Sequence, residues 1–348
     1  MAATSPTTTT TIFLLLLLLL TLLTFTGDAL SDHLNTTTTN LYLSPKTLTT
    51  NYNNMLNSFK IFIYQTPPSP PPPQHSLFYK SLINSHFITQ DPNQAHLFFI
   101  PFNPSISTRS LARVIKNIRT NHPFWNRTLG ADHFYLTTSE GVDLSSDRNI
   151  VELKKNSIQI SPFPTSYGSF IPHKDITLPH VLEKPKPLVN DTKKYMFLGY
   201  MRLSKDIPLS LSEDIKKSEY FTVEHGPLDS KFCLFMYHAD VSWIVEAMAS
   251  RCVPVVITDR PIQDLPLMDV IKWDEIAVFV GPNSGAHGIK KVLEGIEDSR
   301  YEMMVESGVL ATRHLAWNEE PKPYDAFHMI VYQLWLRRHT VRYARWVE

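Results

Sequence analysis

The sequence predicts an α/β fold with two halves, each built around a parallel β-sheet. Short apolar runs of strand length alternate with stretches of helical periodicity, which is the pattern of βαβ units. An aperiodic, proline-containing segment, which ends in a predicted linker at 181–194, separates two such series. The 348 residues are also enough for about two domains. We therefore expect domains at 58–180 and 195–348, with a cleft between them where ligands would bind.

The composition excludes some classes of function. The 33 lysines and arginines equal the 33 aspartates and glutamates, so the formal net charge is zero. A balanced charge gives no electrostatic case for a nucleic-acid-binding protein. Apolar residues make up 43% of the chain, which is typical of a globular protein rather than a disordered one. We therefore expect a folded protein without a nucleic-acid partner.

The chain begins with a predicted targeting segment, residues 1–29. A leucine-rich run at 12–25 follows a threonine-rich start that has no basic residue. The run is shorter than the ~20 apolar residues of a typical membrane span. A cleaved signal peptide and a short signal anchor both fit this pattern, and either would deliver the rest of the chain to the secretory lumen.

A predicted stem or linker at 30–57 follows, rich in threonine and asparagine and poor in apolar residues. The chain also contains sequons for N-glycosylation, which fit exposure to the lumen. They begin at Asn35, Asn126 and Asn190.

The first half alternates strands with helices. We expect, in order, a strand at 60–65, an extended polyproline surface loop at 66–74, a helix at 76–88, a buried strand at 95–102, a helix at 111–119, and a loop leading into a further buried strand within 122–138. Asp132 and His133 stand at the start of that last strand. A carboxylate that orients a histidine could form a general base, so this pair is our candidate for catalysis. The alternative is a histidine that only satisfies loop groups.

The second half begins with a strand at 193–200. A βαβ unit at 230–259 follows, then a strand at 271–280, a helical stretch at 288–310 and a long C-terminal helix at 323–347. Ligands of such sheets bind at the carboxyl ends of the strands. No GxGxxG or P-loop motif is present, so neither standard nucleotide fingerprint applies.

The helix predicted at 242–252 has two distinct faces. Apolar residues from Val241 to Cys252 recur at i, i+4, i+7 and i+11 and should pack on the sheet. Glu246 and Trp243 lie on another side. Glu246 could therefore accept hydrogen bonds from a bound pair of hydroxyls, or be only a solvated helix residue. The start of this helix faces a strand end, where free N–H groups favour an anion such as a diphosphate.

The two cysteines, Cys233 and Cys252, each lie inside an apolar element. We expect two buried thiols, with a disulfide as the alternative in an oxidising compartment. No CxxC or His/Cys cluster predicts a metal site.

Eight stretches, taken together and in order, carry a resemblance to a known family. They are KIFIYQTPP, DPNQAHLFFIPF, HPFWNRTLGADHF, HKDITLP, KYMFLG, SKFCLF, VEAMASRCVPVVITD and YDAFHMIVYQLWLRR. The chain from Lys60 onward thus resembles the exostosin-like glycosyltransferases of plants, glycosyltransferase family 47. The resemblance implies a GT-B fold, in which two Rossmann-like domains face a cleft and the C-terminal domain holds the nucleotide sugar.

The resemblance further implies an inverting transfer from a nucleotide sugar, expected to be a UDP-sugar, to a cell-wall polysaccharide or glycoprotein glycan. It implies a single-pass type II Golgi membrane protein with a lumenal catalytic domain, a secreted protein being the alternative. It implies no cofactor and no obligatory metal.

The family pattern assigns donor-site roles to individual residues. Glu246 matches the acidic residue that binds the nucleotide ribose, Ser230 and Lys231 border the donor pocket, and Arg202 stands in for a basic residue after the first strand of the domain. Trp243 occupies a position where family members usually carry an arginine that contacts the diphosphate, and Arg251 replaces a usual glycine. Either Arg202 or Arg251 could supply the missing guanidinium. The alternative to an active enzyme is a degenerate family member that acts as a glycan-binding or scaffold partner.

Overall fold

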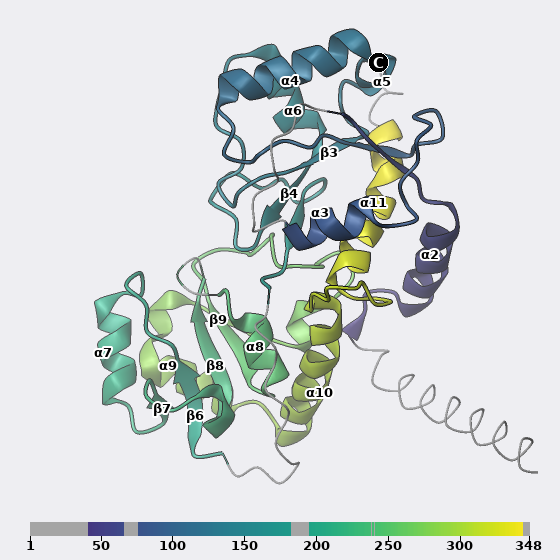
Figure 1. Cartoon of the computed structure of the whole chain (residues 1–348). Helices are drawn as coiled ribbons and strands as arrows, with labels where there is room; N and C mark the ends of the chain where they lie inside the picture. Colours follow the sequence, from purple (N-terminus) through teal and green to yellow (C-terminus); the bar gives the residue numbers. More distant parts are fainter. Residues whose placement is uncertain (1–40, 66–75, 182–194, 238, 240, 344–348) are drawn as a thin grey trace, which may run out of the picture.

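The computed structural model describes residues 41–65, 76–181 and 195–343, apart from 238 and 240. The predicted targeting segment, the start of the stem, the polyproline loop and nearly all of the predicted linker lie outside these ranges, as do Asn35 and Asn190. Two α/β halves, each with a five-stranded parallel sheet, make up the described chain (Figure 1). The predicted fold class, two α/β halves with parallel sheets, is confirmed.

The first sheet has its strands in chain order. They are β1 (Ile61–Ile63), β2 (Leu97–Phe99), β3 (His133–Leu136), β4 (Ile158–Pro162) and β5 (Ile176–Leu178). Helices α4 (Thr108–Asn121), α5 (Pro123–Thr128) and α6 (Arg148–Asn156) cover one face, and α3 (Ser76–Ile83) lies on the other. The apolar stripe of α4, which includes Leu111 and Ile115, is buried, and the Ser107 hydroxyl caps the helix by accepting from the Ser110 N–H.

The second sheet has the order β10-β9-β8-β6-β7, all parallel. The strands are β6 (Phe197–Met201), β7 (Phe221–Thr222), β8 (Ser230–Met236), β9 (Val253–Ile257) and β10 (Val278–Val280). Helices α8 (Ile244–Ala249) and α10 (Asp298–Leu315) pack together on one face, and α7 (Leu209–Lys217) packs with α9 (Gly285–Glu294) on the other. Short 3₁₀ turns at Pro227–Asp229, Trp273–Glu275 and Pro282–Ser284 join these elements.

Several predicted elements are shorter than expected. The helix at 242–252 forms only over the six residues of α8, and the helical stretch at 288–310 is interrupted at Gly295 between α9 and α10. Part of the predicted stem is also structured. Helix α2 (Pro45–Ser58) buries Leu48, Tyr52 and Met55, so this segment belongs to the folded body rather than to a linker.

The C-terminal helix α11 (Ala326–Tyr343) returns to the first half. It contacts α2, α3 and β5 as well as α10, and Figure 1 shows it running along the first sheet. The largest apolar cluster accordingly continues from one half into the other, from Phe99 and Phe134 to Phe235 and Trp335. The two halves therefore share a core.

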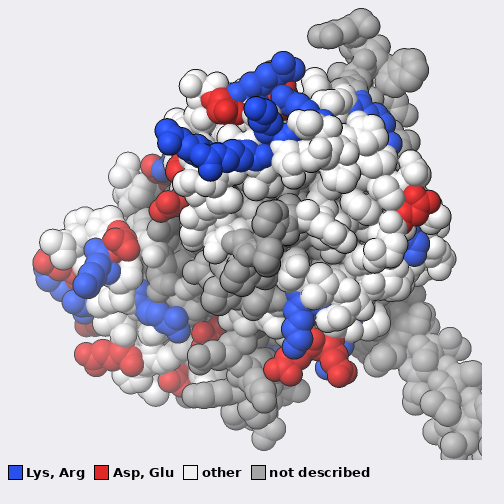
Figure 2. Space-filling view, turned by 45° about the horizontal axis from the view of Figure 1, so that its top comes forward, with Lys and Arg blue, Asp and Glu red and all other residues white. Residues whose placement is uncertain are grey.

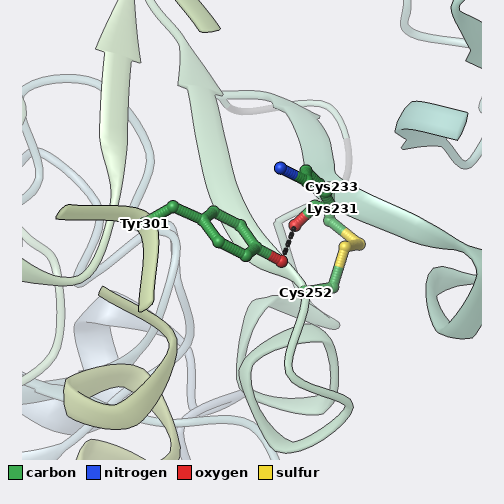
Figure 3. Close-up of a disulfide and its surroundings, with 4 residues drawn as sticks. All are labelled: Lys231, Cys233, Cys252 and Tyr301. Atoms are coloured by element: carbon green, nitrogen blue, oxygen red, sulfur yellow. Dashed lines mark hydrogen bonds between the residues drawn. A yellow bond between two sulfur atoms is a disulfide. The ribbon is translucent and has the colours of Figure 1, made fainter. Parts of the chain in front are cut away.

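Cys233 and Cys252 form a disulfide, with their Cα atoms 5.6 Å apart (Figure 3). The expectation of two buried thiols was therefore wrong. Burial itself was correct, since both residues are at most 1% exposed. The reason for the difference lies in the sheet, because Cys233 of β8 pairs in register with Pro254, two residues beyond Cys252. Sequence position alone does not reveal that register.

Among the residues that the structure describes, no helix is both long enough and apolar enough to cross a membrane.

Candidate functional site

Arg202 and Glu246 meet at the carboxyl edge of the second sheet. Arg202 directly follows β6, Glu246 lies in the first turn of α8 after β8, and β6 pairs with β8 along their lengths. The Arg202 Nη2 atom lies 3.7 Å from Glu246 Oε2. The two side chains are 41% and 49% exposed, so both remain accessible to a ligand.

Trp243 packs against the Arg202 side chain of this pair. Its indole is 3% exposed and packs against Phe235 and Tyr200, with ring centroids 4.3 Å and 5.7 Å apart. The Arg202 guanidinium carbon lies 4.5 Å from the centroid of the Trp243 ring, a distance typical of a cation–π contact. The tryptophan at the family's usual arginine position thus holds the guanidinium of another residue on its face.

The other predicted donor residues lie at the opposite edge of this sheet. Ser230 and Lys231 begin β8, and Lys231 Nζ lies 3.2 Å from Asp298 and 5.0 Å from the Tyr301 ring centroid. The Tyr301 hydroxyl donates to the Lys231 carbonyl (Figure 3). Arg251 stands between α8 and β9. Since α8 runs back against the strands, its last turn comes down to the amino edge. The structure therefore brings Glu246 and Arg202 together but separates both from Ser230, Lys231 and Arg251.

The backbone conformation of Arg251 explains why a glycine would suit this position. Its φ is 62°, in the left-handed region where glycine is favoured. A glycine at this position would therefore suit the turn into β9, and Arg251 lies at the edge of the sheet away from Arg202 and Glu246.

Asp132 and His133 are buried at the amino end of β3, away from the cleft. His133 is 0% exposed, its Nδ1 lies 2.7 Å from Asp132 Oδ1, and its Nε2 lies 2.9 Å from the Tyr64 hydroxyl. Burial lowers the pKa of His133, so the ring is neutral near pH 7. With both ring nitrogens engaged and no exposed surface, the predicted base has no access to an acceptor hydroxyl.

The Asp132 carboxylate completes a structural network. Burial alone would raise its pKa, but hydrogen bonds from His133, Thr128 and Arg127 outweigh burial and lower the pKa of Asp132 below its ordinary value. The network therefore holds an ionised aspartate beside a neutral histidine and links β3 to α5 and to Tyr64.

A large cavity lies at the carboxyl edge of the first sheet, where it faces the second half. Its volume is about 1160 Å³. The segments that follow β3, β4 and β5 form most of its wall, and two residues of the second half complete it. The lining residues are Thr138, Ser139, Glu140, Pro162, Phe163, Pro164, Thr165, Ser166, Tyr167, Leu178, Pro179, His180, Val181, Arg260 and Trp317.

Arg260 and Tyr167 form one side of this cavity. The Arg260 guanidinium carbon lies 4.8 Å from the Tyr167 ring centroid, and its Nε donates to Asp259 Oδ1 at 3.0 Å. Tyr167 is 85% exposed, so the ring face that Arg260 does not cover is open to stack on a sugar. An aromatic face, a guanidinium and the Glu140 carboxylate in one cavity can hold a polyhydroxylated ligand.

Asp264 joins the two halves at the base of the cleft. Its Oδ2 accepts from the Thr165 N–H at 2.8 Å and from the Thr165 hydroxyl at 2.7 Å. The Tyr237 hydroxyl donates to the other carboxylate oxygen, and burial raises the pKa of Tyr237, so the phenol keeps its proton. The Trp317 indole N–H also crosses the cleft to the Pro179 carbonyl at 2.8 Å.

Sequence reasoning did not identify Glu140, Tyr167, Arg260 or Asp264. A signal existed for Arg260, since polar residues directly after a β-branched run mark the carboxyl end of a buried strand. Tyr167 and Asp264 lie in proline-rich segments without periodicity, and no sequence pattern connects them to the cleft.

The described residues contain no group of three or more His, Cys, Asp or Glu side chains that could hold a metal ion.

The Exostosin GT47 domain matches residues 55–198 and 203–296. The chain belongs to this family of glycosyltransferases. The match includes β8, α8, Trp243 and Glu246, whereas Arg202 falls in the short gap between the two matched segments. Family membership confirms the predicted resemblance and the expectation of a transferase.

Two curated relatives illustrate the breadth of the family. "Probable glycosyltransferase At5g25310" of Arabidopsis thaliana is 29% identical over 355 residues, covering 87% of this chain and 72% of that protein. "Probable beta-1,4-xylosyltransferase IRX10" from the same plant is 23% identical over 303 residues, covering 73% of this chain and 72% of that protein. Among solved structures, Arabidopsis thaliana UGT89C1 complexed with UDP-L-rhamnose matches 83% of this chain and 94% of its own, with a TM-score of 0.30 and 11% identity.

Proposed function

We propose that this GT47 glycosyltransferase transfers a sugar, with inversion, from a UDP-sugar to a cell-wall polysaccharide or glycoprotein glycan. The observation that carries the proposal is the cluster of Arg202, Trp243 and Glu246 at the carboxyl edge of the second sheet. That edge is where nucleotides bind in open α/β sheets. The name of the xylosyltransferase relative supports the transfer of a sugar.

In this proposal Glu246 and Arg202 bind different parts of the nucleotide sugar. The exposed Glu246 carboxylate accepts hydrogen bonds from the ribose hydroxyls. Arg202 lies beside it with a planar set of donors that suits the diphosphate, and the Trp243 ring restricts the directions in which this guanidinium can point. When the diphosphate leaves, a fixed guanidinium stabilises its growing charge, an effect that for single oxyanion donors is about 2.7–4 kcal/mol.

The acceptor occupies the cavity of the first half. We assign the role of base to Glu140, because it is the carboxylate among the residues described as lining that cavity. The acceptor hydroxyl oxygen bonds to the anomeric carbon as the bond from that carbon to the diphosphate oxygen breaks. The hydroxyl proton passes to the Glu140 carboxylate, and the bonding electrons leave with the diphosphate toward Arg202. Attack from the face opposite the leaving group inverts the anomeric centre.

We further propose that the protein works in the lumen of the Golgi, held to the membrane by its N-terminal segment. The Cys233–Cys252 disulfide supports an oxidising compartment. Asn126, the sequon residue within the described ranges, is exposed on α5, as a glycosylated asparagine must be.

Calorimetric titration of the full chain with UDP and a panel of UDP-sugars tests the donor site. We expect binding that Glu246→Ala weakens at least tenfold, since a hydrogen bond to a charged group contributes about 1.5–3 kcal/mol. Arg202→Ala should lower kcat by roughly 100- to 1,000-fold. Lys217→Ala is the control, because Lys217 forms an ion pair of similar length with Glu213, 3.6 Å apart and more exposed, on α7.

An assay of sugar transfer, run beside the calorimetric titration on the same proteins, separates catalysis from binding. Glu140→Gln should abolish transfer while leaving UDP affinity unchanged. The second candidate function, a degenerate scaffold, is favoured by the tryptophan at position 243. Absence of nucleotide binding at millimolar donor would rule out the donor site and leave the scaffold.

A further inference from the structure

Helix α4 carries a row of cations on its exposed side. Arg109, Arg113 and Lys116 follow one another at i, i+4 and i+7, so they lie along one stripe, while the opposite face of α4 is buried against the first sheet. None of the three forms an ion pair among the residues that the structure describes. The next cation, Arg119, is instead held by Glu152. Figure 2 shows lysine and arginine side chains gathered in the upper part of the molecule.

A hollow of about 460 Å³ lies along this stripe. Its other wall is the segment before α6 with the first turn of that helix, which contributes hydroxyl and amide groups from Ser145, Ser146 and Asn149. Asp147 also lines the hollow, and its Oδ1 accepts from the Asn149 N–H at 2.8 Å as the cap of α6. Three cations therefore face one carboxylate that is already hydrogen-bonded. The hollow has a net positive charge although the whole chain has none.

The hollow begins at the carboxyl edge of the first sheet, the same edge as the cavity lined by Glu140 and Tyr167. Helix α4 starts after the carboxyl end of β2, and the segment between β3 and α6 starts after the carboxyl end of β3. That second segment provides Glu140 to the cavity and Ser145, Ser146 and Asp147 to the hollow. A ligand that extends out of the cavity along this segment would reach the stripe.

We propose that the cationic stripe of α4 (Arg109, Arg113 and Lys116) binds the uronate carboxylates of an acidic acceptor polysaccharide whose reacting end lies in the cleft cavity. The proposal rests on the glycosyltransferase function proposed above and adds the chemical class of the acceptor. The stripe spans about 10 Å of helix, at 1.5 Å per residue, which is long enough to contact two consecutive sugar rings. Arginine forks pair with carboxylates in two-point contacts, and the hydroxyl and amide wall suits the ring hydroxyls.

A polysaccharide fits these features better than a lipid surface does. The cations line a concave hollow with polar groups on both sides, whereas a membrane requires a convex or flat basic surface. The single carboxylate of Asp147 also disfavours densely charged phosphate groups more than widely spaced uronates.

The probe is an oligogalacturonate of defined length, compared with a neutral xylo-oligosaccharide of equal length and titrated into the full chain. We expect the acidic oligomer to bind at least tenfold more tightly at low salt, with the difference shrinking as salt rises. The triple variant Arg109→Gln, Arg113→Gln, Lys116→Gln should lose that preference and keep its UDP affinity. The control replaces Lys205, Lys216 and Lys217 of the second half by glutamine, which removes the same charge far from α4.

Each other outcome is decisive. Equal affinity for acidic and neutral oligomers, or an unchanged preference in the α4 variant, would overturn the proposal. So would binding to phosphatidylserine vesicles that oligogalacturonate does not displace. If the unmodified chain does not bind UDP, the proposed donor site is wrong. If that chain still binds the acidic oligomer in a charge-dependent way, the cationic stripe is supported independently.

Discussion

His133 has both ring nitrogens bonded inside the first half, and it stacks on Tyr64 and Phe98 with centroids 5.5 Å and 5.0 Å apart. At the scale of single residues, a His–Asp pair has the same appearance in a sequence whether it is a base or a structural network. Exposure distinguishes the two, and His133 has none.

We therefore expect His133→Ala to impair stability rather than chemistry. The variant loses two buried hydrogen bonds and leaves a cavity among aromatic rings, which should lower the free energy of unfolding by about 3 kcal/mol. The kcat/KM of the folded fraction should stay within twofold of the unmodified enzyme. Urea unfolding and steady-state kinetics on the same preparations would measure both effects.

The pH dependence of stability follows from the lowered pKa of His133. In the unfolded chain the ring takes a proton near its ordinary pKa of about 6.5, whereas in the fold it does so only at lower pH. The neutral His133 ring therefore contributes its full stabilisation at pH values above its unfolded pKa of about 6.5. This stabilisation is lost as the pH falls from there through the lower pKa of the folded state. Between pH 7.5 and 5 the unmodified chain should lose more stability than His133→Ala. A transfer rate that loses its acidic limb in the variant would show that His133 is a base after all.

The donor cluster shows how much of a site the sequence can predict. The helical period predicted that Glu246 faces away from the core, and the family pattern left Arg202 and Arg251 as alternative sources of a guanidinium. In the structure Arg202 is the one that lies beside Glu246. The family pattern also assigned Ser230, Lys231 and Arg251 to the donor pocket, but they lie at the other edge of the sheet. Each strand or helix of a βαβ unit crosses the whole sheet, however, so residues a few positions apart can lie at opposite edges.

At the scale of elements, the periodicity predicted the type of most strands and helices but not their lengths. α8 stops at Ala249 because the chain must turn at Arg251 to enter β9. Helix α2 was not predicted, because its sequence is polar apart from a few well-spaced apolar residues. These residues are buried, and the helix contacts α11. Both outcomes depend on neighbours that are distant in sequence.

The disulfide ties β8 to the start of β9 around α8. It closes a loop with a sequence separation of 19, so the chain-entropy estimate of its stabilisation is about 3 kcal/mol. We expect the double variant Cys233→Ala, Cys252→Ala to lose about that free energy of unfolding, measured in urea. Reductant should destabilise the unmodified chain and leave the variant unaffected. An equal response of both proteins to reductant would mean that the bond does not form.

At the scale of the whole molecule, elements from the two ends of the chain hold the halves together. α11 packs on the first sheet, and its Arg337 guanidinium donates to the carbonyls of Lys174 and Asp175 beside β5 and to Asp269 of the second half. The Tyr42 hydroxyl lies 2.5 Å from His314 of α10. The sequence indicates that a long C-terminal helix exists, but a helix that is apolar on several sides does not reveal which half it covers.

Asp264 is the point at which this assembly can be tested, because one carboxylate receives hydrogen bonds from Thr165 of the first half and Tyr237 of the second. Asp264→Ala leaves the buried Thr165 N–H and Tyr237 hydroxyl without that acceptor, which should cost about 3 kcal/mol of stability. Since Thr165 also lines the acceptor cavity, the KM for acceptor should rise several-fold while the affinity for UDP changes little.

Two variants that each remove a single hydrogen bond to Asp264 provide a comparison for the stability loss in Asp264→Ala. Thr165→Val removes only the hydroxyl bond, and Tyr237→Phe only the phenol bond, so each should produce a fraction of the Asp264→Ala effect. If the carboxylate couples the halves, the two losses should add to less than the loss in Asp264→Ala, because the Thr165 N–H bond survives in both. A rise in the KM for acceptor that is matched by an equal loss of UDP affinity would show instead that Asp264 supports the second half alone.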